Sequence, residues 1–373
     1  MLEKSPVPFA TPGPAVRRPA VLGGRPLFDR DVFVTRPVMP DPEAFARRTA
    51  CLFASHWLTN EGPLMVELET RLAERLDVAA CTTFCNGTTA LLTALRALDL
   101  RGEVITTPFT FPATVHCIEW NGLRPVFADI DPAGYCLDPA AVEACIGPET
   151  SAIVPVHVFG NPCDVAGFER LAERHGLRVV YDAAHCFGVR HRGRSIGAWG
   201  DCAVFSFHAT KVFHSAEGGA VVARDPALHE RLALLRNFGI VSEDEVRGVG
   251  LNGKLSELHA AMGLLVLDLV DEEIERRGRL ASLYRDGLAS VPGLRMQRIA
   301  DETVENHFNL TIEIDPEAFG LDRDAVHRAL LAEHVVTRKY FHPLCSENPC
   351  YRDLPSAAPG AGACRARRVS TMP

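Results

Sequence analysis

The sequence contains no long hydrophobic run and few aromatic residues. Its longest apolar candidate, residues 260–270, is shorter than a bilayer span and is interrupted by Asp268, which argues against a membrane-spanning helix. Aromatic residues make up 7% of the 373 positions, and no basic cluster is interleaved with them, so a surface for stacking nucleic-acid bases is not expected. The formal net charge of −8 also argues against a chain that coats nucleic acid or an anionic membrane.

Signals for secretion and for metal binding are also missing. The first twenty residues contain five prolines and no apolar segment of the signal-peptide type, so we expect an N-terminal arm over residues 1–30 and a cytoplasmic protein. The twelve cysteines are scattered through apolar segments and are expected to be free, buried thiols. Because none of them forms a Cys-x-x-Cys pair and no His pair completes a ligand set, no metal site is expected.

What the sequence does contain is a regular alternation of strand and helix patterns between Leu76 and Val222. This alternation predicts an α/β fold with a mostly parallel central sheet covered by helices. In such sheets ligands bind at the carboxyl ends of the strands, so residues that directly follow a strand are candidates for function. The expected strands cover residues 79–84, 103–106, 125–128, 152–156, 178–181, 202–207 and 219–223, with helices over 88–98 and 113–120.

The C-terminal third has a different pattern. An amphipathic helix is predicted from about Leu255 to about Ala289, followed by a strand over Phe308–Ile314 and a helix over Arg323–Glu333. We therefore expect a large domain over residues 31–255, then a linking helix and a smaller α+β domain over 256–373. Residues 355–367, rich in Ala, Pro, Gly and Arg, are expected to form a loop.

Two strand ends carry polar groups that suit an anionic, ring-shaped cofactor. The turn Cys85–Thr89 offers small residues and backbone N–H groups at a helix N-terminus, where a phosphate can bind, although the same residues are common in ordinary caps and turns. Asp182 follows an apolar strand beside small alanines and can meet a ring nitrogen or cap the next helix. His185, taken alone, is more often a structural histidine than a ligand.

A third strand end carries a lysine. Lys211 closes the segment Ser206–Lys211, which follows an apolar strand and precedes Gly218 and Gly219. In such surroundings a lysine loses hydration, which lowers its pKa and frees the amine for Schiff-base chemistry. A solvated surface lysine would be the default elsewhere in the chain.

Taken in order, these segments resemble the DegT/DnrJ/EryC1/StrS sugar aminotransferases, which are fold type I enzymes dependent on pyridoxal 5′-phosphate (PLP). The resemblance extends from about Val34 to about Tyr351. It is carried by eight segments in the family's order: Trp57–Asn60, Phe84–Thr88, Val104–Phe111, Val156–Gly160, Asp182–His185, Ser206–Lys211, Arg236–Gly239 and Gly250–Glu257.

The resemblance implies a role for each residue around the cofactor ring. Lys211 would hold PLP as a Schiff base and later move a proton between the cofactor and the substrate carbon. Asp182 would pair with the pyridinium nitrogen and keep it protonated, so that the ring accepts electrons. Phe111 would stack on the ring, and His185 would lie against its phenolic oxygen.

The resemblance also implies how the phosphate is bound. Gly87, Thr88 and Ser206 would hold the phosphate of the cofactor in the same subunit. Asn252 would reach the phosphate of the neighbouring subunit's cofactor, which implies a homodimer with shared active sites.

The implied reaction runs in two halves. L-glutamate would give its amino group to PLP, forming pyridoxamine phosphate (PMP), and the amine would then pass to a keto group of a nucleotide-linked sugar. The Ser206–Lys211 segment, the Glu217–Gly219 segment after it and the segment Thr337–Pro343 are similar to the branch that acts on 4-keto-6-deoxy sugars. We therefore expect amination at C4 of dTDP-4-keto-6-deoxy-D-glucose, in the biosynthesis of a deoxyaminosugar for an antibiotic or a surface glycan.

Other interpretations stay open at this point. They are a 3-keto sugar aminotransferase, an aminotransferase for an inositol-type ketone, and a PLP-dependent sugar dehydratase, in which histidine typically replaces the Schiff-base lysine. From another class, a non-catalytic sugar-nucleotide-binding or regulatory relative would have no need of Lys211 or Asp182. Compared with the family, the sequence stops at Pro373 before the expected final helix, so either the protein is short or its end is missing.

Overall fold

The computed structural model describes residues 17–358, 365–366 and 369 of the chain. Its centre is a seven-stranded sheet with the strand order β1-β9-β8-β5-β4-β2-β3. Strands β8, β5, β4, β2 and β3 run parallel to one another, whereas β9 is antiparallel to both β1 and β8. The mostly parallel sheet expected from the sequence is therefore confirmed. The strands are β1 Thr82–Phe84, β2 Glu103–Thr106, β3 Arg124–Phe127, β4 Thr150–Val154, β5 Arg178–Asp182, β8 Cys202–Ser206 and β9 Gly219–Ala223.

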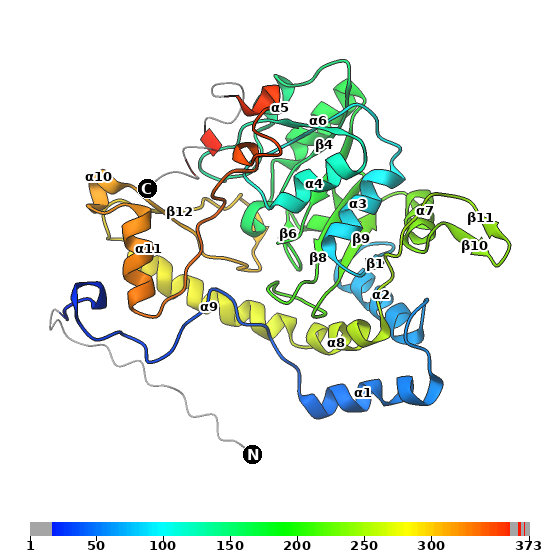
Figure 1. Ribbon diagram of the computed structural model, residues 1–373, viewed down its shortest axis with the longest axis horizontal. Coiled ribbons are helices and arrows are strands. Elements are labelled where there is room, and N and C mark those ends of the chain that lie inside the picture. The colour runs from blue at the N-terminus through cyan, green and yellow to red at the C-terminus, as the bar shows by residue number, and fades with distance from the viewer. Residues whose placement is uncertain (1–16, 359–364, 367–368, 370–373) are drawn as a thin grey trace.

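Helices cover both faces of this sheet (Figure 1). Successive strand residues point to opposite faces, so Val104 packs in one apolar core and Ile105 in the other. One face is covered by α3, α4 and α7, and the other by α2, α6 and α8. Because both faces are buried, the central residues of β4, β5, β8 and β9 are mostly apolar. The helices are α2 Pro63–Arg75, α3 Gly87–Ala97, α4 Pro112–Trp120, α5 Pro139–Glu143, α6 Val165–His175, α7 Pro226–Arg236 and α8 Glu257–Leu267.

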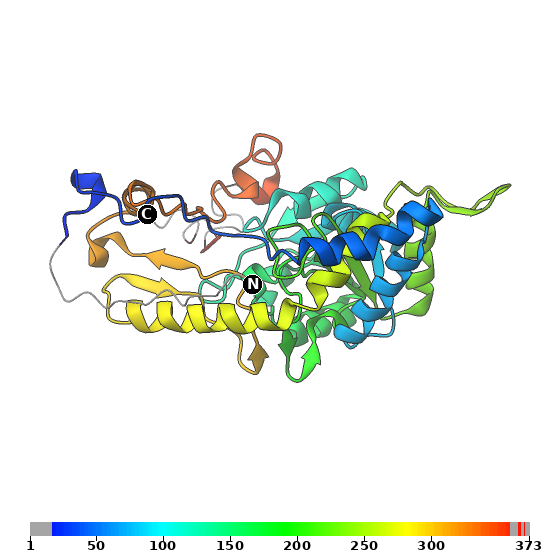
Figure 2. The same cartoon turned by 90° about the horizontal axis from the view of Figure 1, so that it is seen from below.

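The single long helix predicted over residues 255–289 is wrong: the structure has two helices, α8 and α9 (Val270–Leu288). Helix α8 is buried over most of its surface and packs against α2, and Asp268 at its C-terminal cap pairs with Arg71 of α2. Helix α9 is largely exposed and runs away from the sheet (Figure 2).

Helix α9 leads to a smaller unit beside the sheet. Here β12 (Leu294–Met296) pairs antiparallel with β14 (Ile312–Ile314), next to α10 (Pro316–Phe319) and α11 (Arg323–Ala332). The strand predicted over 308–314 begins only at Ile312. The preceding residues leave the extended path because the side chain of Asn306 accepts the backbone N–H of Phe308 and binds backbone carbonyls of the large unit.

The N-terminal residues that the structure describes lie on the small unit. The carboxylate of Glu333, which caps α11, accepts the backbone N–H groups of Ala20 and Leu27, each at 2.7 Å, and Val32 bridges to Val335. The first sixteen residues of the expected arm, and most of the loop expected beyond residue 358, lie outside the described residues. The chain then enters α1 (Pro42–Ser55), which packs on α8.

Short elements complete the described chain. A projecting hairpin pairs β10 with β11, and a small sheet has the order β13-β6-β7 (Figure 2). Within the described ranges no helix has the length and apolar character needed to cross a membrane. These elements are β6 Arg190–His191, β7 Arg194–Ser195, β10 Ile240–Ser242, β11 Glu245–Val246, β13 Thr303–Val304, and the 3₁₀ helices Ala20–Leu22, Val158–Gly160, Ile196–Ala198, Cys345–Glu347 and Pro355–Ala357.

Candidate active site

Lys211 lies at the carboxyl end of the sheet, just after β8, with its side chain partly buried. Its amine nitrogen sits 5.0 Å from the centre of the Phe308 ring. Burial lowers the pKa of the Lys211 amine from 10.5 to about 8, against the opposing attraction of Asp182 and Cys186. A sizeable fraction of this amine is therefore neutral near pH 8, and only the neutral amine is a nucleophile.

Asp182 ends β5, the strand beside β8. One carboxylate oxygen accepts the Thr114 hydroxyl at 2.8 Å, and the other accepts the backbone N–H of Ala184 at 3.1 Å. Burial raises the pKa of Asp182, while these two hydrogen bonds and the charge of Lys211 oppose the rise. The carboxylate is thus held in a fixed orientation, next to a cationic side chain and away from bulk solvent.

His185 follows Asp182 and is held by the turn at Val158–Gly160. Its Nδ1 accepts the backbone N–H of Phe159 at 3.1 Å, so the neutral ring carries its proton on Nε2. Burial, and secondly the charge of Lys211, keep the pKa of His185 well below its usual range. The ring also stacks on Phe308, with centroids 4.4 Å apart and planes 15° from parallel.

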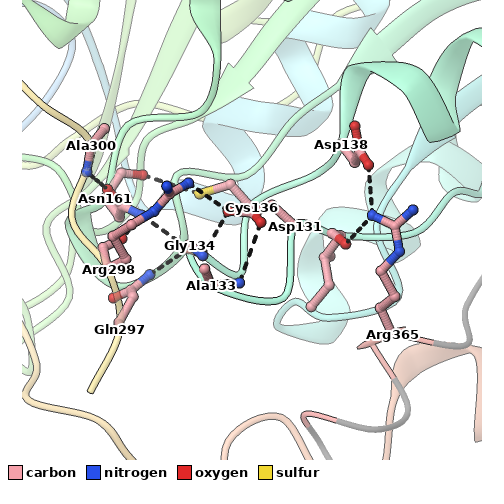
Figure 3. Close-up of polar contacts among 11 residues, drawn as sticks. Asp131, Ala133, Gly134, Cys136, Asp138, Asn161, Gln297, Arg298, Ala300 and Arg365 are labelled. Carbon is pink, nitrogen blue, oxygen red and sulfur yellow. Dashed lines mark hydrogen bonds and ion pairs between the residues drawn. The ribbon is translucent and has the colours of Figure 1, made fainter. Parts of the chain in front are cut away.

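The turn that carries Phe159 is anchored by the next polar residue, Asn161. The Asn161 side-chain amide donates to the carbonyls of Gly134 and Arg298 at 2.9 and 3.0 Å, and its oxygen accepts the backbone N–H of Ala300 at 2.8 Å (Figure 3). Asn161 is almost fully buried. Because these partners come from both the large unit and the segment before β13, the turn is fixed where the two units meet.

The turn after β1 lies closely against the end of β8. Asn86 caps α3 by accepting the backbone N–H of Thr89 at 2.7 Å. A Cβ on Gly87 would lie 2.9 Å from Cβ of Ser206, and a Cβ on Gly219 would lie 2.6 Å from the backbone of Asn86 and Gly87. Glycine is therefore required at both positions, and it brings the N-terminus of α3 beside the Ser206 hydroxyl, an arrangement that suits a phosphate.

Three other candidate residues are exposed. Thr88 occupies the first turn of α3. Phe111, 64% exposed, precedes α4 and lies one turn from Thr114. Asn252 lies in the loop before α8, beside Gly253, whose carbonyl accepts the backbone N–H of Cys85 at 2.8 Å. The structure thus places Lys211, Asp182, His185, Gly87 and Ser206 at the carboxyl end of the sheet. Thr88, Phe111 and Asn252 are exposed at the surface of the chain.

Sequence reasoning missed Phe308, Thr114 and the backbone role of Phe159. Phe159 lies in the segment Val156–Gly160, one of the eight that carry the family resemblance, so its importance could have been suspected from the sequence. Its role in binding His185 could not. Phe308 was interpreted as part of a strand, and no local pattern marks it as an active-site residue.

A partly buried lysine and a fixed carboxylate at adjacent strand ends, beside a glycine-lined helix N-terminus, are the arrangement expected of a PLP-dependent enzyme of the α/β class. The chain belongs to the DegT/DnrJ/EryC1/StrS aminotransferase family, whose model matches residues 41–370. It is accordingly an aminotransferase, and its cofactor is PLP.

Similar proteins agree with this assignment. A dTDP-4-amino-4,6-dideoxy-D-glucose transaminase from Escherichia coli is 41% identical over 88% of this chain and 89% of its own length. The structure of DesI in the presence of its TDP-sugar product is 41% identical, has a TM-score of 0.89, and is matched over 94% of this chain and 89% of that one. DesV from S. venezuelae, in complex with a ketimine intermediate, is 32% identical with a TM-score of 0.81, over 90% and 91% of the two chains.

Proposed function

We propose that this chain moves the amino group of L-glutamate to C4 of dTDP-4-keto-6-deoxy-D-glucose. The observation that carries the proposal is the Lys211 amine, with its lowered pKa, beside the fixed carboxylate of Asp182. A lysine with a purely structural role beside an aspartate would be expected to form a direct ion pair, which raises the pKa of the lysine amine. A lysine kept partly neutral is suited to bond formation with a carbonyl.

The residues present fit PLP. The Gly87–Ser206 contact and the first turn of α3 supply small groups and N–H donors for the phosphate, with Thr88 beside them. Asp182 supplies a carboxylate for the pyridinium nitrogen, and Phe111 has an exposed ring one turn from Thr114 for the face of the cofactor. When bound to Lys211, PLP supplies an electron sink for the bonds at the substrate's amine-bearing carbon.

The chain's own groups then have defined tasks. Lys211 holds the cofactor covalently and, once free, carries the proton at the reacting carbon. Asp182 keeps a proton on the ring nitrogen through a charge-assisted hydrogen bond, which is strong because the site is desolvated. His185 presents its Nε2–H as a neutral donor to the phenolic oxygen, since Phe159 occupies Nδ1.

The substrate is proposed from the relatives. The E. coli relative is named for a 4-amino-4,6-dideoxy sugar linked to dTDP, and DesI for a TDP-sugar product. Identity of 41% over nearly nine-tenths of the chain supports the same keto carbon here. We place the reaction in deoxyaminosugar biosynthesis, for an antibiotic or a surface glycan.

We further propose a homodimer with shared active sites, in which Asn252 reaches the partner's cofactor phosphate. Asn252 is exposed, and large apolar side chains are exposed nearby in the hairpin region and on α1, an arrangement typical of an interface. They include Phe53 on α1, Trp57 just after α1, and Phe238, Val246 and Val249 in the hairpin region. A cytoplasmic location is supported by the free thiols of the eleven described cysteines.

One experiment tests the activity and the position of amination together. The purified protein with PLP is reduced with borohydride and mapped by mass spectrometry, and the expected adduct is on Lys211. It is then incubated with L-glutamate and dTDP-4-keto-6-deoxy-D-glucose, with a 3-keto isomer and an inositol-type ketone in parallel. We expect 2-oxoglutarate and an amine at C4 by NMR. An amine at C3, or no turnover of any ketone by the PLP-loaded protein, would contradict the proposal.

A further inference from the structure

Phe308 contacts two residues of the site at once. Its ring stacks on His185 at 4.4 Å and lies under the Lys211 amine at 5.0 Å. The side chain is only 6% exposed. It comes from the small unit, whereas Lys211 and His185 come from the large unit, so the contact depends on how the two units are assembled.

The position of Phe308 is set by hydrogen bonds on both sides of its peptide group. Its N–H is accepted by Asn306 at 3.1 Å, and the Asn306 amide donates to the carbonyls of His185 and Phe187 at 2.8 and 2.9 Å. Its carbonyl accepts from Arg277 of α9 at 3.2 Å. Asn306 is 1% exposed, so this connection is shielded from water.

Asp182 is the anionic group near Lys211, and its charge attracts the amine. Each carboxylate oxygen of Asp182 also accepts a hydrogen bond from another donor, which fixes its orientation, and the ion pairs of the described residues do not include one between Asp182 and Lys211. His185 is kept neutral, and burial holds the pKa of the Cys186 thiol well above its usual range. The face of an aromatic ring attracts an ammonium group within about 6 Å, and Phe308 supplies this attraction.

We infer that Phe308 is a positioning residue that receives the amine of Lys211 whenever that amine is free of the cofactor. This inference rests on the proposed role of Lys211. A lysine that holds the cofactor and later carries a proton would be free of the cofactor for part of each turnover. The ring of Phe308 holds the released ammonium near Asp182 and His185 without a salt bridge that would have to be broken. It also couples the docking of the small unit to the placement of Lys211.

The sequence makes a direct measurement possible, because it contains only four lysines: Lys4, Lys211, Lys254 and Lys339. The full-length chain is produced with lysine labelled with ¹³C at Cε, and the Lys211 signal is assigned by its loss in Lys211→Arg. The pKa of Lys211 is measured by NMR titration, first without cofactor and then with PMP bound. The first measurement does not depend on aminotransferase activity, so it distinguishes failure of this inference from failure of the proposed function.

Phe308→Leu keeps an apolar side chain but removes the ring. We expect it to lower the pKa of Lys211 by about half a unit to one unit, which is what the loss of a cation–π contact implies. We also expect the upfield ring-current shift of the Lys211 ε-methylene signals to disappear. Phe308→Tyr, which keeps a ring, should preserve both the pKa and the shift, and it serves as the second variant if the leucine variant does not fold.

A matched control lies at the other end of the same ring stack, in which Phe341 packs on Phe159 with planes 9° apart. Phe341→Leu should leave the pKa of Lys211 within about 0.2 units of the parent value, since the ring removed is not the one under the amine. A Phe308→Leu chain with an unchanged or raised pKa of Lys211, or equal effects of the two leucine variants, would overturn the inference.

Discussion

Phe159 donates its backbone N–H to Nδ1 of His185 over 3.1 Å from a left-handed backbone conformation, with φ at +58°. This conformation is unfavourable for a bulky residue and persists where surrounding contacts fix it. Asn161 supplies such contacts two residues later. The result is a neutral histidine with one defined donor, Nε2–H.

The first prediction follows from that donor. His185→Gln provides an amide N–H in its place and should retain kcat/KM within about tenfold, whereas His185→Phe keeps the stack on Phe308 but has no donor. We expect the phenylalanine variant to lose about a hundredfold or more, as removal of one preorganised donor does. Steady-state kinetics of the two variants, with the absorption spectrum of bound PLP, provide the check. Equal activity of the two variants would contradict a role for His185 as a hydrogen-bond donor.

The second prediction concerns pH and the Lys211 amine. Below its pKa of about 8, the neutral fraction rises about tenfold for each pH unit, and above it the amine is nearly all neutral. The rate at which the cofactor-free chain takes up PLP should therefore rise steeply to about pH 8 and then level off, as followed by stopped-flow absorbance. A rate that keeps rising to pH 10 would mean an ordinary lysine.

The third prediction concerns Asp182. Asp182→Asn keeps the shape of the side chain but removes the charge opposite the pyridinium nitrogen. Loss of one partner of a desolvated ion pair costs about 3–5 kcal/mol, so kcat/KM should fall by at least about a hundredfold. Asp225→Asn is the control, because Asp225 only caps α7 at the surface. A similar activity in the two variants would count against the proposed pairing.

The fourth prediction concerns the tight contact at Gly219. A Cβ there would lie 2.6 Å from the backbone of the turn after β1, so Gly219→Ala should move that turn. We expect a loss of about 1–3 kcal/mol in the free energy of unfolding and weaker binding of PLP, measured by denaturant melts and fluorescence titration. Gly287→Ala, in open space on α9, should leave PLP binding unchanged and gain up to about 1 kcal/mol from helix propensity.

Some features could be predicted because their signals are local. Alternating strand and helix patterns indicated the parallel sheet, and the polar residues after the strands ending at Asp182 and Ser206 indicated the side of the sheet where the site lies. The break between α8 and α9 was missed because both segments have helical composition. The two helices differ in burial, since α8 packs on α2 and is buried over most of its surface, whereas α9 is largely exposed. Phe308 was assigned to a strand because apolar and polar residues alternate from Phe308 to Ile312, as they do in a half-buried strand.

The sequence by itself determined that Asp182 and Lys211 come after two successive apolar strands of the predicted sheet, because strand period, apolar runs and the residues after them lie within short segments. Only the tertiary structure decided what surrounds the amine of Lys211. Its lowered pKa, the tautomer of His185 and the ring beneath the ammonium group depend on burial and on contacts between residues far apart in the chain. These contacts form only when the small unit, α9 and the sheet are assembled, so no local pattern can encode them.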